Sequence, residues 1–203
     1  MKKYAVLHEP GDIVTLAGTR FVVLDVERRG SLPDSLFLLA LESVGASEFG
    51  SSNNYAESDL KKAVDKWLED MGKRGLDNAK LIPREIDLTT LDGSGCYGKL
   101  SVKAAPLTLD EAREYADIIP NAERWCWLAT GWSGPSKSDG DLALGVNSNG
   151  DWNYYICSGS SGIRPALKAP SILFEDSEAG LDLSKIPTDN LLREIHRRLA
   201  EKA

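Results

Sequence analysis

The stretch LGVNSNGDWNYYICSGSSGIRPAL, residues 144–167, carries the features on which the predicted fold depends. It places Asn149-Gly150 between two strand-like runs, which predicts a β-hairpin because both residues tolerate the positive φ of a type I′ turn. The second run is rich in Trp and Tyr, Ser and Gly follow it, and the stretch closes on Gly-Ile-Arg-Pro. Aromatic residues in so polar a setting predict a surface for recognition rather than a core.

Short β segments surround this hairpin. Within residues 124–169, clusters of Gly, Ser, Asn and Pro separate four strand-like segments: RWCWLAT, DLALGVNS, DWNYYICS and GIRPALKA. Further upstream, DIVTLAGTRFVVLDVER predicts a hairpin that turns at residues 17–19, and SLFLLALES and EIDLTTL predict two more strands. The second half of the chain is therefore expected to be mostly sheet and loop.

Two helices are predicted between these strands. Ser58 is the expected N-cap of the first, which has an apolar face and ends at Gly72 or Gly75. Thr108 and Glu111 stand in capping-box spacing, so a second helix is expected to start beside them and to end before residue 120. The predicted fold class is α+β, with two helices flanking small antiparallel sheets and a loop-rich second half.

Length and composition favour one domain plus an appendage: a ligand-binding domain over residues 1–174, then an acidic linker and an amphipathic helix within residues 175–203. The helix, at residues 189–202, is too short to be stable alone. We expect it to pack on its own domain, on a second copy in a homo-oligomer, or on another protein such as a component of a phage particle.

The charge and the apolar pattern exclude several classes of partner. With 31 acidic and 24 basic residues spread along the chain, the net charge of −7 argues against binding to nucleic acid. No apolar run is long enough for a signal peptide or a membrane span, so the cytoplasm is the expected site of synthesis. Three cysteines without metal-ligand spacing indicate neither disulfides nor a zinc site, and no cofactor is expected.

The candidate binding surface combines the hairpin with the loop at residues 132–136. Side-chain alternation is expected to put Trp152 and Tyr154 on one face of the strand, and Asn153 and Tyr155 on the other. Trp132 is either an anchor for a ligand or a cap on the core. The predicted ligand-binding residues are Trp132, Ser133, Ser136, Asn147, Asn149, Asp151, Trp152, Asn153, Tyr154, Tyr155, Ser158 and Ser160.

Six segments follow one another along the chain in a characteristic order: GDIVTLAGTRFVVLDV, SNNYAESDLKKAVDKWLED, PLTLDEAREY, WCWLATG, LGVNSNGDWN and GIRPALKA. Together they resemble a bacterial and phage family of domains of unknown function with the C-type-lectin-like fold that formylglycine-generating enzymes share. The resemblance implies a ligand-binding surface on the C-terminal loops, for a protein or glycan. Because some proteins of this fold are variable proteins of diversity-generating retroelements, it also implies that these positions are diversified.

The resemblance also brings two kinds of chemistry into consideration. Formylglycine-generating enzymes bind copper through two cysteines, which makes an oxidase that uses Cys126 and Cys157 the alternative function. Calcium-dependent lectins use clustered acids, but Asp139, Asp141 and Asp151 are expected to be solvated, so no metal site is predicted. A structural role is expected for Trp125, Trp127, Gly162, Arg164 and Pro165. The guanidinium of Arg164 is expected to bond to buried carbonyls or to a carboxylate.

Overall fold

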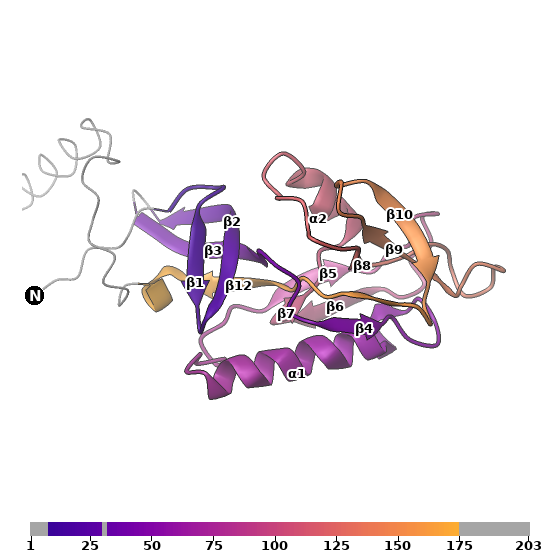
Figure 1. The fold of residues 1–203 in the computed structure, drawn as a ribbon, viewed down its shortest axis with the longest axis horizontal. Coiled ribbons are helices and arrows are strands. Elements are labelled where there is room, and N and C mark those ends of the chain that lie inside the picture. The colour runs from indigo at the N-terminus through magenta and orange to yellow at the C-terminus, as the bar shows by residue number, and fades with distance from the viewer. Residues whose placement is uncertain (1–7, 30–31, 175–203) are drawn as a thin grey trace, which may run out of the picture.

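Two five-stranded sheets lie side by side along the long axis of the molecule (Figure 1). The computed structural model describes residues 8–29 and 32–174. The first sheet has the order β1 (Ile13–Leu16), β2 (Thr19–Arg29), β3 (Leu32–Ala40), β12 (Ala166–Pro170), β7 (Ala104–Ala105). The second has the order β10 (Trp152–Ile156), β9 (Leu142–Val146), β8 (Cys126–Gly131), β11 (Ser160–Gly162), β4 (Ala46–Glu48). A separate pair is formed by β5 (Arg84–Asp87) and β6 (Lys99–Val102).

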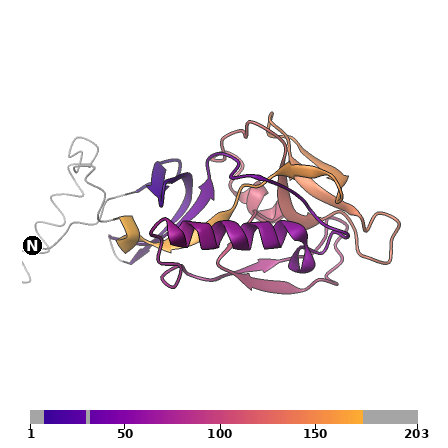
Figure 2. The same ribbon diagram turned by 60° about the horizontal axis from the view of Figure 1, so that its bottom comes forward.

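The first predicted helix is confirmed as α1 (Asp59–Lys73). Its N-cap is Ser58, whose Oγ accepts a hydrogen bond of 2.9 Å from the Lys61 N–H, and Gly75 takes a φ of +102° just beyond its end. The helix runs beneath both sheets and contacts strands of each, among them β7 and β4 (Figure 2). Its apolar face therefore joins the two halves of the molecule through a single core.

The second helix, α2 (Leu109–Glu114), is shorter than predicted. The capping box is present, because the Thr108 hydroxyl accepts from the Glu111 N–H and the Glu111 carboxylate accepts from the Thr108 N–H at 2.8 Å. After α2 the chain forms a turn in which Ile118 and Ile119 both donate to the carbonyl of Tyr115. The two isoleucines pack on the core beneath α2, and a proline follows them, which disfavours helical backbone at Ile119.

The run of apolar residues in β2 is explained by burial on both faces of the first sheet. Phe21 and Val23 belong to the main core above α1, whereas Val22 and Leu24 belong to a second core beneath α2. A strand buried on both faces has an unbroken apolar sequence rather than an alternating one. The middle of β2 therefore lies between the two cores of the molecule.

Both predicted hairpins are present, but the turn of the second is not type I′. In the first, Ala17 and Gly18 have φ values of 46° and 75°. In the second, five residues separate β9 from β10, and Gly150 has a positive φ while Asn149 does not. The side chain of Asn147 closes this turn by accepting hydrogen bonds from the backbone N–H groups of Asn149 and Asp151. A local side-chain acceptor thus replaces the predicted Asn-Gly turn.

GIRPALKA, predicted as one strand, is divided between the two sheets. Its first residue ends β11 in the second sheet, and β12 in the first sheet begins at Ala166. The intervening residues cross beside the segment that connects β3 with β4: Ile163 donates to Gly45 at 3.0 Å, and Ala40 donates to Pro165 at 2.9 Å. The two sheets are therefore joined by two adjacent chain crossings that hydrogen-bond to each other.

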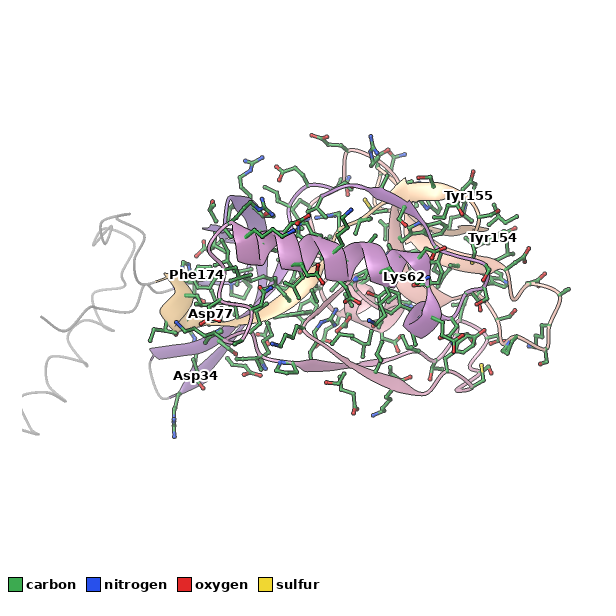
Figure 3. All side chains as sticks on the ribbon, turned by 90° about the horizontal axis from the view of Figure 1, so that it is seen from below. Asp34, Lys62, Asp77, Tyr154, Tyr155 and Phe174 are labelled. Atoms are coloured by element: carbon green, nitrogen blue, oxygen red, sulfur yellow. The ribbon has the colours of Figure 1, made fainter. Side chains whose placement is uncertain are left out.

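The described residues begin and end at the same end of the molecule. The ring of His8 lies edge-on to that of Phe174, at 5.8 Å between centroids, and Phe174 belongs to the short 3₁₀ helix η2 (Ser171–Phe174). Tyr154 and Tyr155 lie at the opposite end (Figure 3). Within residues 8–29 and 32–174, no helix has the length and apolar character needed to cross a membrane. The linker and helix predicted for residues 175–203 lie outside the described residues.

Candidate functional site

The candidate site is built on β10, which forms one edge of the second sheet (Figure 1). All five residues of this strand are exposed, including four large side chains: Trp152 (41%), Tyr154 (47%), Tyr155 (47%) and Ile156 (44%). Exposed apolar side chains gathered on a single strand are characteristic of interaction sites, whereas isolated ones are common on any surface. We call the exposed side chains of β10, with Trp132 and Arg113 that contact them, the β10 surface.

The expected alternation of side chains is confirmed by their contacts. On one face of β10, the ring of Tyr154 lies 4.4 Å from that of Trp132 between centroids, and the guanidinium of Arg113 lies 5.4 Å from the centroid of the Trp152 ring. Trp132 is half-buried and packs on the core beneath α2, so it both caps this core and holds Tyr154. These contacts restrain the two exposed rings before any ligand binds.

The other face of β10 carries Tyr155. Its ring lies 6.4 Å from Trp125 and 6.1 Å from the buried Trp127, between centroids. Gly159 lies directly against this ring, because a Cβ built on the glycine would be 2.7 Å from Cδ1 of Tyr155 and closer still to Cε1. The absence of a side chain at residue 159 therefore leaves room for the tyrosine ring, which is tilted by 58° to Trp125 and by 38° to Trp127.

The backbone of β10 also faces solvent on one side. Cys157 donates to the carbonyl of Asp141 at 2.7 Å and Asn147 donates to that of Asp151 at 2.9 Å, so the odd-numbered residues of the strand pair with β9. The N–H and C=O groups of the even-numbered residues consequently point away from the sheet. One of these groups, the Tyr154 N–H, donates a hydrogen bond of 2.9 Å to the side chain of Asn153.

A buried asparagine holds the loop that carries Trp132. Asn53 donates from Nδ2 to the carbonyls of Ser133 and Leu142, at 2.9 and 3.0 Å, and its Oδ1 accepts a bond of 2.6 Å from the hydroxyl of Tyr97. Its backbone N–H donates to Gly140 at 3.1 Å. Both ends of the loop at residues 133–141 are thereby attached to the segment that precedes α1.

The tip of the same loop is attached by an ion pair. Lys137 Nζ lies 2.6 Å from a carboxylate oxygen of Asp92, in the turn after β5. The hydrogen bond from Lys137, together with one from the hydroxyl of Thr90, lowers the pKa of the Asp92 carboxyl. Because the Lys137 side chain is 61% exposed and that of Asp92 21%, solvent screens this pair, which orients the loop rather than fixing it.

The predicted ligand-binding residues do not form one continuous surface. Trp132 contacts β10, but Ser133 is only 2% exposed, so the expectation that it lies on the binding surface is wrong. Ser160 lies in β11, three strands from β10 in the sheet order, and pairs with Glu48. Asn147 is half-buried and closes the turn. The remaining predicted residues are exposed: Ser136, Asn149, Asp151, Trp152, Asn153, Tyr154, Tyr155 and Ser158.

The residues expected to be structural make framework contacts. Trp127 is buried and donates from Nε1 to the carbonyl of Ser47 at 2.9 Å, while Trp125 is half-buried beneath Tyr155. A Cβ at Gly162 would lie 2.8 Å from Sγ of Cys126, which explains the glycine. Pro165 is buried in the chain crossing.

The two cysteines of the alternative function are buried and lie apart. Cys126 pairs with Val146 at one end of β9, whereas Cys157 hydrogen-bonds to Asp141 beyond the other end. About 17 Å of strand separates Val146 from Asp141, whereas the sulfur atoms bound to one metal ion lie within about 5 Å of each other. Burial raises the pKa of both thiols, that of Cys157 to about 12. The geometry therefore does not favour a copper site shared by these cysteines.

The acidic residues considered for calcium do not converge. Asp141 and Asp151 lie at opposite ends of the β9–β10 hairpin, and Asp139 lies in the loop at residues 133–141. In the described part of the chain, no three His, Cys, Asp or Glu side chains are grouped so that they could hold a metal ion.

Sequence reasoning missed three residues of this region. Arg113 lies on α2, thirty-nine residues from Trp152 in the sequence, and no local signal connects the two. Asn53 precedes a helix, where asparagine is common without any long-range role. Gly159 lies in a Ser- and Gly-rich segment that was expected to be loop. The signal that could have identified it is the preceding Tyr154-Tyr155 pair, because a glycine near aromatic residues can mark a place where a ring lies against the backbone.

Comparison of the chain with protein-family models, with curated proteins and with solved structures finds no match in any of the three.

Proposed function

We propose that this protein is a non-enzymatic recognition protein that binds a protein or glycan ligand through the β10 surface. The observation that carries the proposal is the group of four large exposed side chains on one edge strand, three of which are held in place by neighbouring aromatic or cationic groups. Tyr and Trp supply a large contact area at a small entropic cost, and restraint before binding lowers that cost further. Ser, Asn and Asp at the ends of the hairpin supply adaptable hydrogen bonds around these rings.

The resemblance described above supports a finer proposal. A C-type-lectin-like domain, encoded by a phage or prophage and diversified by a retroelement, would vary the exposed Asn, Ser, Tyr and Asp codons and retain the buried framework. The neighbouring DNA tests this part: we expect a reverse-transcriptase gene and a near-copy of the last coding segment that differs at adenines. A gene neighbourhood lacking both would remove diversification from the proposal and leave recognition intact.

Recognition is tested by selecting binders from a random peptide display library and from a glycan array with the full chain as bait. The Trp152→Ala, Tyr154→Ala, Tyr155→Ala triple variant is then compared with wild type. Truncating an interface anchor costs about 2 kcal/mol or more, so binding should fall by at least about thirtyfold. Circular dichroism should show that the triple variant remains folded.

A matched control removes three other large exposed side chains that are scattered elsewhere, by the substitutions Ile13→Ala, Leu91→Ala and Ile172→Ala. The control should retain binding. Equal loss in both triple variants, or selected binders that tolerate the β10 substitutions, would show that the β10 surface is not the recognition site.

A further inference from the structure

A small cavity lies beside the β10 surface, between α2 and the second sheet. It has a volume of about 100 Å³. Its walls are largely apolar and include Leu107, Ile119, Leu128 and Val146. Ala116 and Trp152 also line it and are both exposed, so the cavity opens to solvent between the end of α2 and the start of β10.

Arg164 also lines this cavity and is only 7% exposed. Its Nε donates to the carbonyl of Ala40 at 3.0 Å and its Nη1 donates to that of Pro120 at 3.1 Å, which fixes the plane of the guanidinium. Its Nη2 is buried and has no hydrogen-bond partner among the described residues. Two of the five N–H donors of this side chain are therefore used, and a whole amino group is left over.

The charge of Arg164 is not balanced by a neighbouring acid. No ion pair within residues 8–29 and 32–174 includes it, and Glu42, the carboxylate whose charge acts on it, is itself paired with Arg20. The thiol of Cys126 lies on the cavity wall, but burial raises its pKa and keeps it neutral. A buried cation without a counter-ion is costly, because desolvation is not offset by an opposite charge.

We propose that this cavity binds a small aliphatic carboxylate, with the carboxylate on Nη2 of Arg164 and the hydrocarbon body against Leu128, Val146 and Ile119. A guanidinium supplies planar, charge-assisted hydrogen bonds that match a carboxylate, and the apolar walls match a short alkyl group. A cavity of about 150 Å³ accommodates benzene, so this one fits an acid with roughly four or five non-hydrogen atoms, such as propionate. Phosphate and sulfate have no apolar part to bury here.

This binding site is independent of the proposed recognition function. The cavity shares only Trp152 with the β10 surface, and a variant that closes the cavity can leave every residue of β10 unchanged. Ala116→Leu is that variant, because Ala116 is exposed at the mouth of the cavity and a leucine there would extend over the opening. Ala79→Leu is the matched control, since Ala79 is also an exposed alanine in a turn and does not line the cavity.

The full chain labelled with ¹⁵N is titrated with sodium propionate, with propionamide as a neutral molecule of nearly the same shape, and with sodium sulfate. We expect saturable binding of propionate with a shift of the Arg164 Nε–H resonance, and a Kd at least tenfold lower than for propionamide. Ala116→Leu should weaken propionate binding at least tenfold, and Ala79→Leu should leave it unchanged.

Four outcomes would overturn the proposal. Absence of saturable propionate binding would mean that Nη2 is satisfied by water. Equal affinity for propionamide, or binding of sulfate at the same resonances, would show that the guanidinium does not select a carboxylate with an alkyl body. Propionate binding that survives Ala116→Leu would place the ligand elsewhere.

Discussion

The substitution Asn53→Asp should destabilise the protein far more than its small chemical change suggests. Asn53 donates two hydrogen bonds from Nδ2 to the carbonyls of Ser133 and Leu142, at 2.9 and 3.0 Å, and is 1% exposed. In the variant, both donors are lost and a carboxylate oxygen faces two carbonyl oxygens. Each lost hydrogen bond costs about 1 kcal/mol, and the buried unpaired charge adds at least as much again, for a total of about 3 kcal/mol or more.

For a protein of this size, a loss of about 3 kcal/mol lowers the melting temperature by about 6–12 °C. Thermal unfolding followed by circular dichroism, and urea unfolding followed by tryptophan fluorescence, measure the change. The new carboxyl should have a raised pKa in the folded state. Its destabilising effect is therefore largest at neutral pH, and it should decrease as the pH falls towards about 4, where the protonated carboxyl can donate one hydrogen bond.

The adjacent residue provides a matched control. Asn54 is the N-cap of the short 3₁₀ helix η1 (Tyr55–Glu57), where its Oδ1 accepts a hydrogen bond of 3.1 Å from the Ala56 N–H. Aspartate serves equally well as an N-cap, so Asn54→Asp should change the free energy of unfolding by less than about 0.5 kcal/mol. If the two substitutions have similar effects, or if Asn53→Asp costs less than about 1 kcal/mol, the loop is not held by the bonds described here.

Two further predictions concern the β10 surface and the cysteines. Gly159→Ala should displace the ring of Tyr155, because the new Cβ would overlap it, and should shift the ring resonances in NMR spectra. The free energy of unfolding should change by less than about 1 kcal/mol, because the backbone φ of Gly159 suits alanine and the exposed ring can move aside. Unchanged ring resonances would contradict the contact. Titration of the native protein with a thiol reagent at pH 8 should detect one fast thiol, Cys96, since Cys126 and Cys157 are buried with raised pKa values; two or more fast thiols would contradict this burial.

The elements that could be predicted from the sequence are those specified by local chemistry. Ser58 and the capping box at Thr108 mark where both helices begin, and the alternation in β10 predicts which contacts its rings make. The strands that sequence analysis missed, β4, β6, β7 and β11, have at most four residues each. Such short strands form because a partner strand is present, and pairing across the sheet leaves little trace in local sequence.

Long-range packing explains the other errors. The segment GIRPALKA has the apolar composition of one strand, but it crosses between sheets because residues 40–45 supply hydrogen bonds along the crossing. Ser133 is a polar residue in a Gly- and Ser-rich loop, yet it is buried because Asn53 holds its backbone carbonyl. The exposed part of the candidate site was predictable from composition, whereas the contacts that restrain it depend on residues far away in the sequence.

The contact between His8 and Phe174 places both ends of the described chain at the same end of the molecule, which matters for attaching it to a support. Tyr154 and Tyr155 lie at the far end of the long axis (Figure 3). An attachment made at either end of the described chain therefore leaves the two tyrosine rings on the side away from the support. The same orientation would result on a chip, on a fusion partner or on a large particle. The ends of the described chain and the two tyrosines thus lie at opposite poles of the molecule.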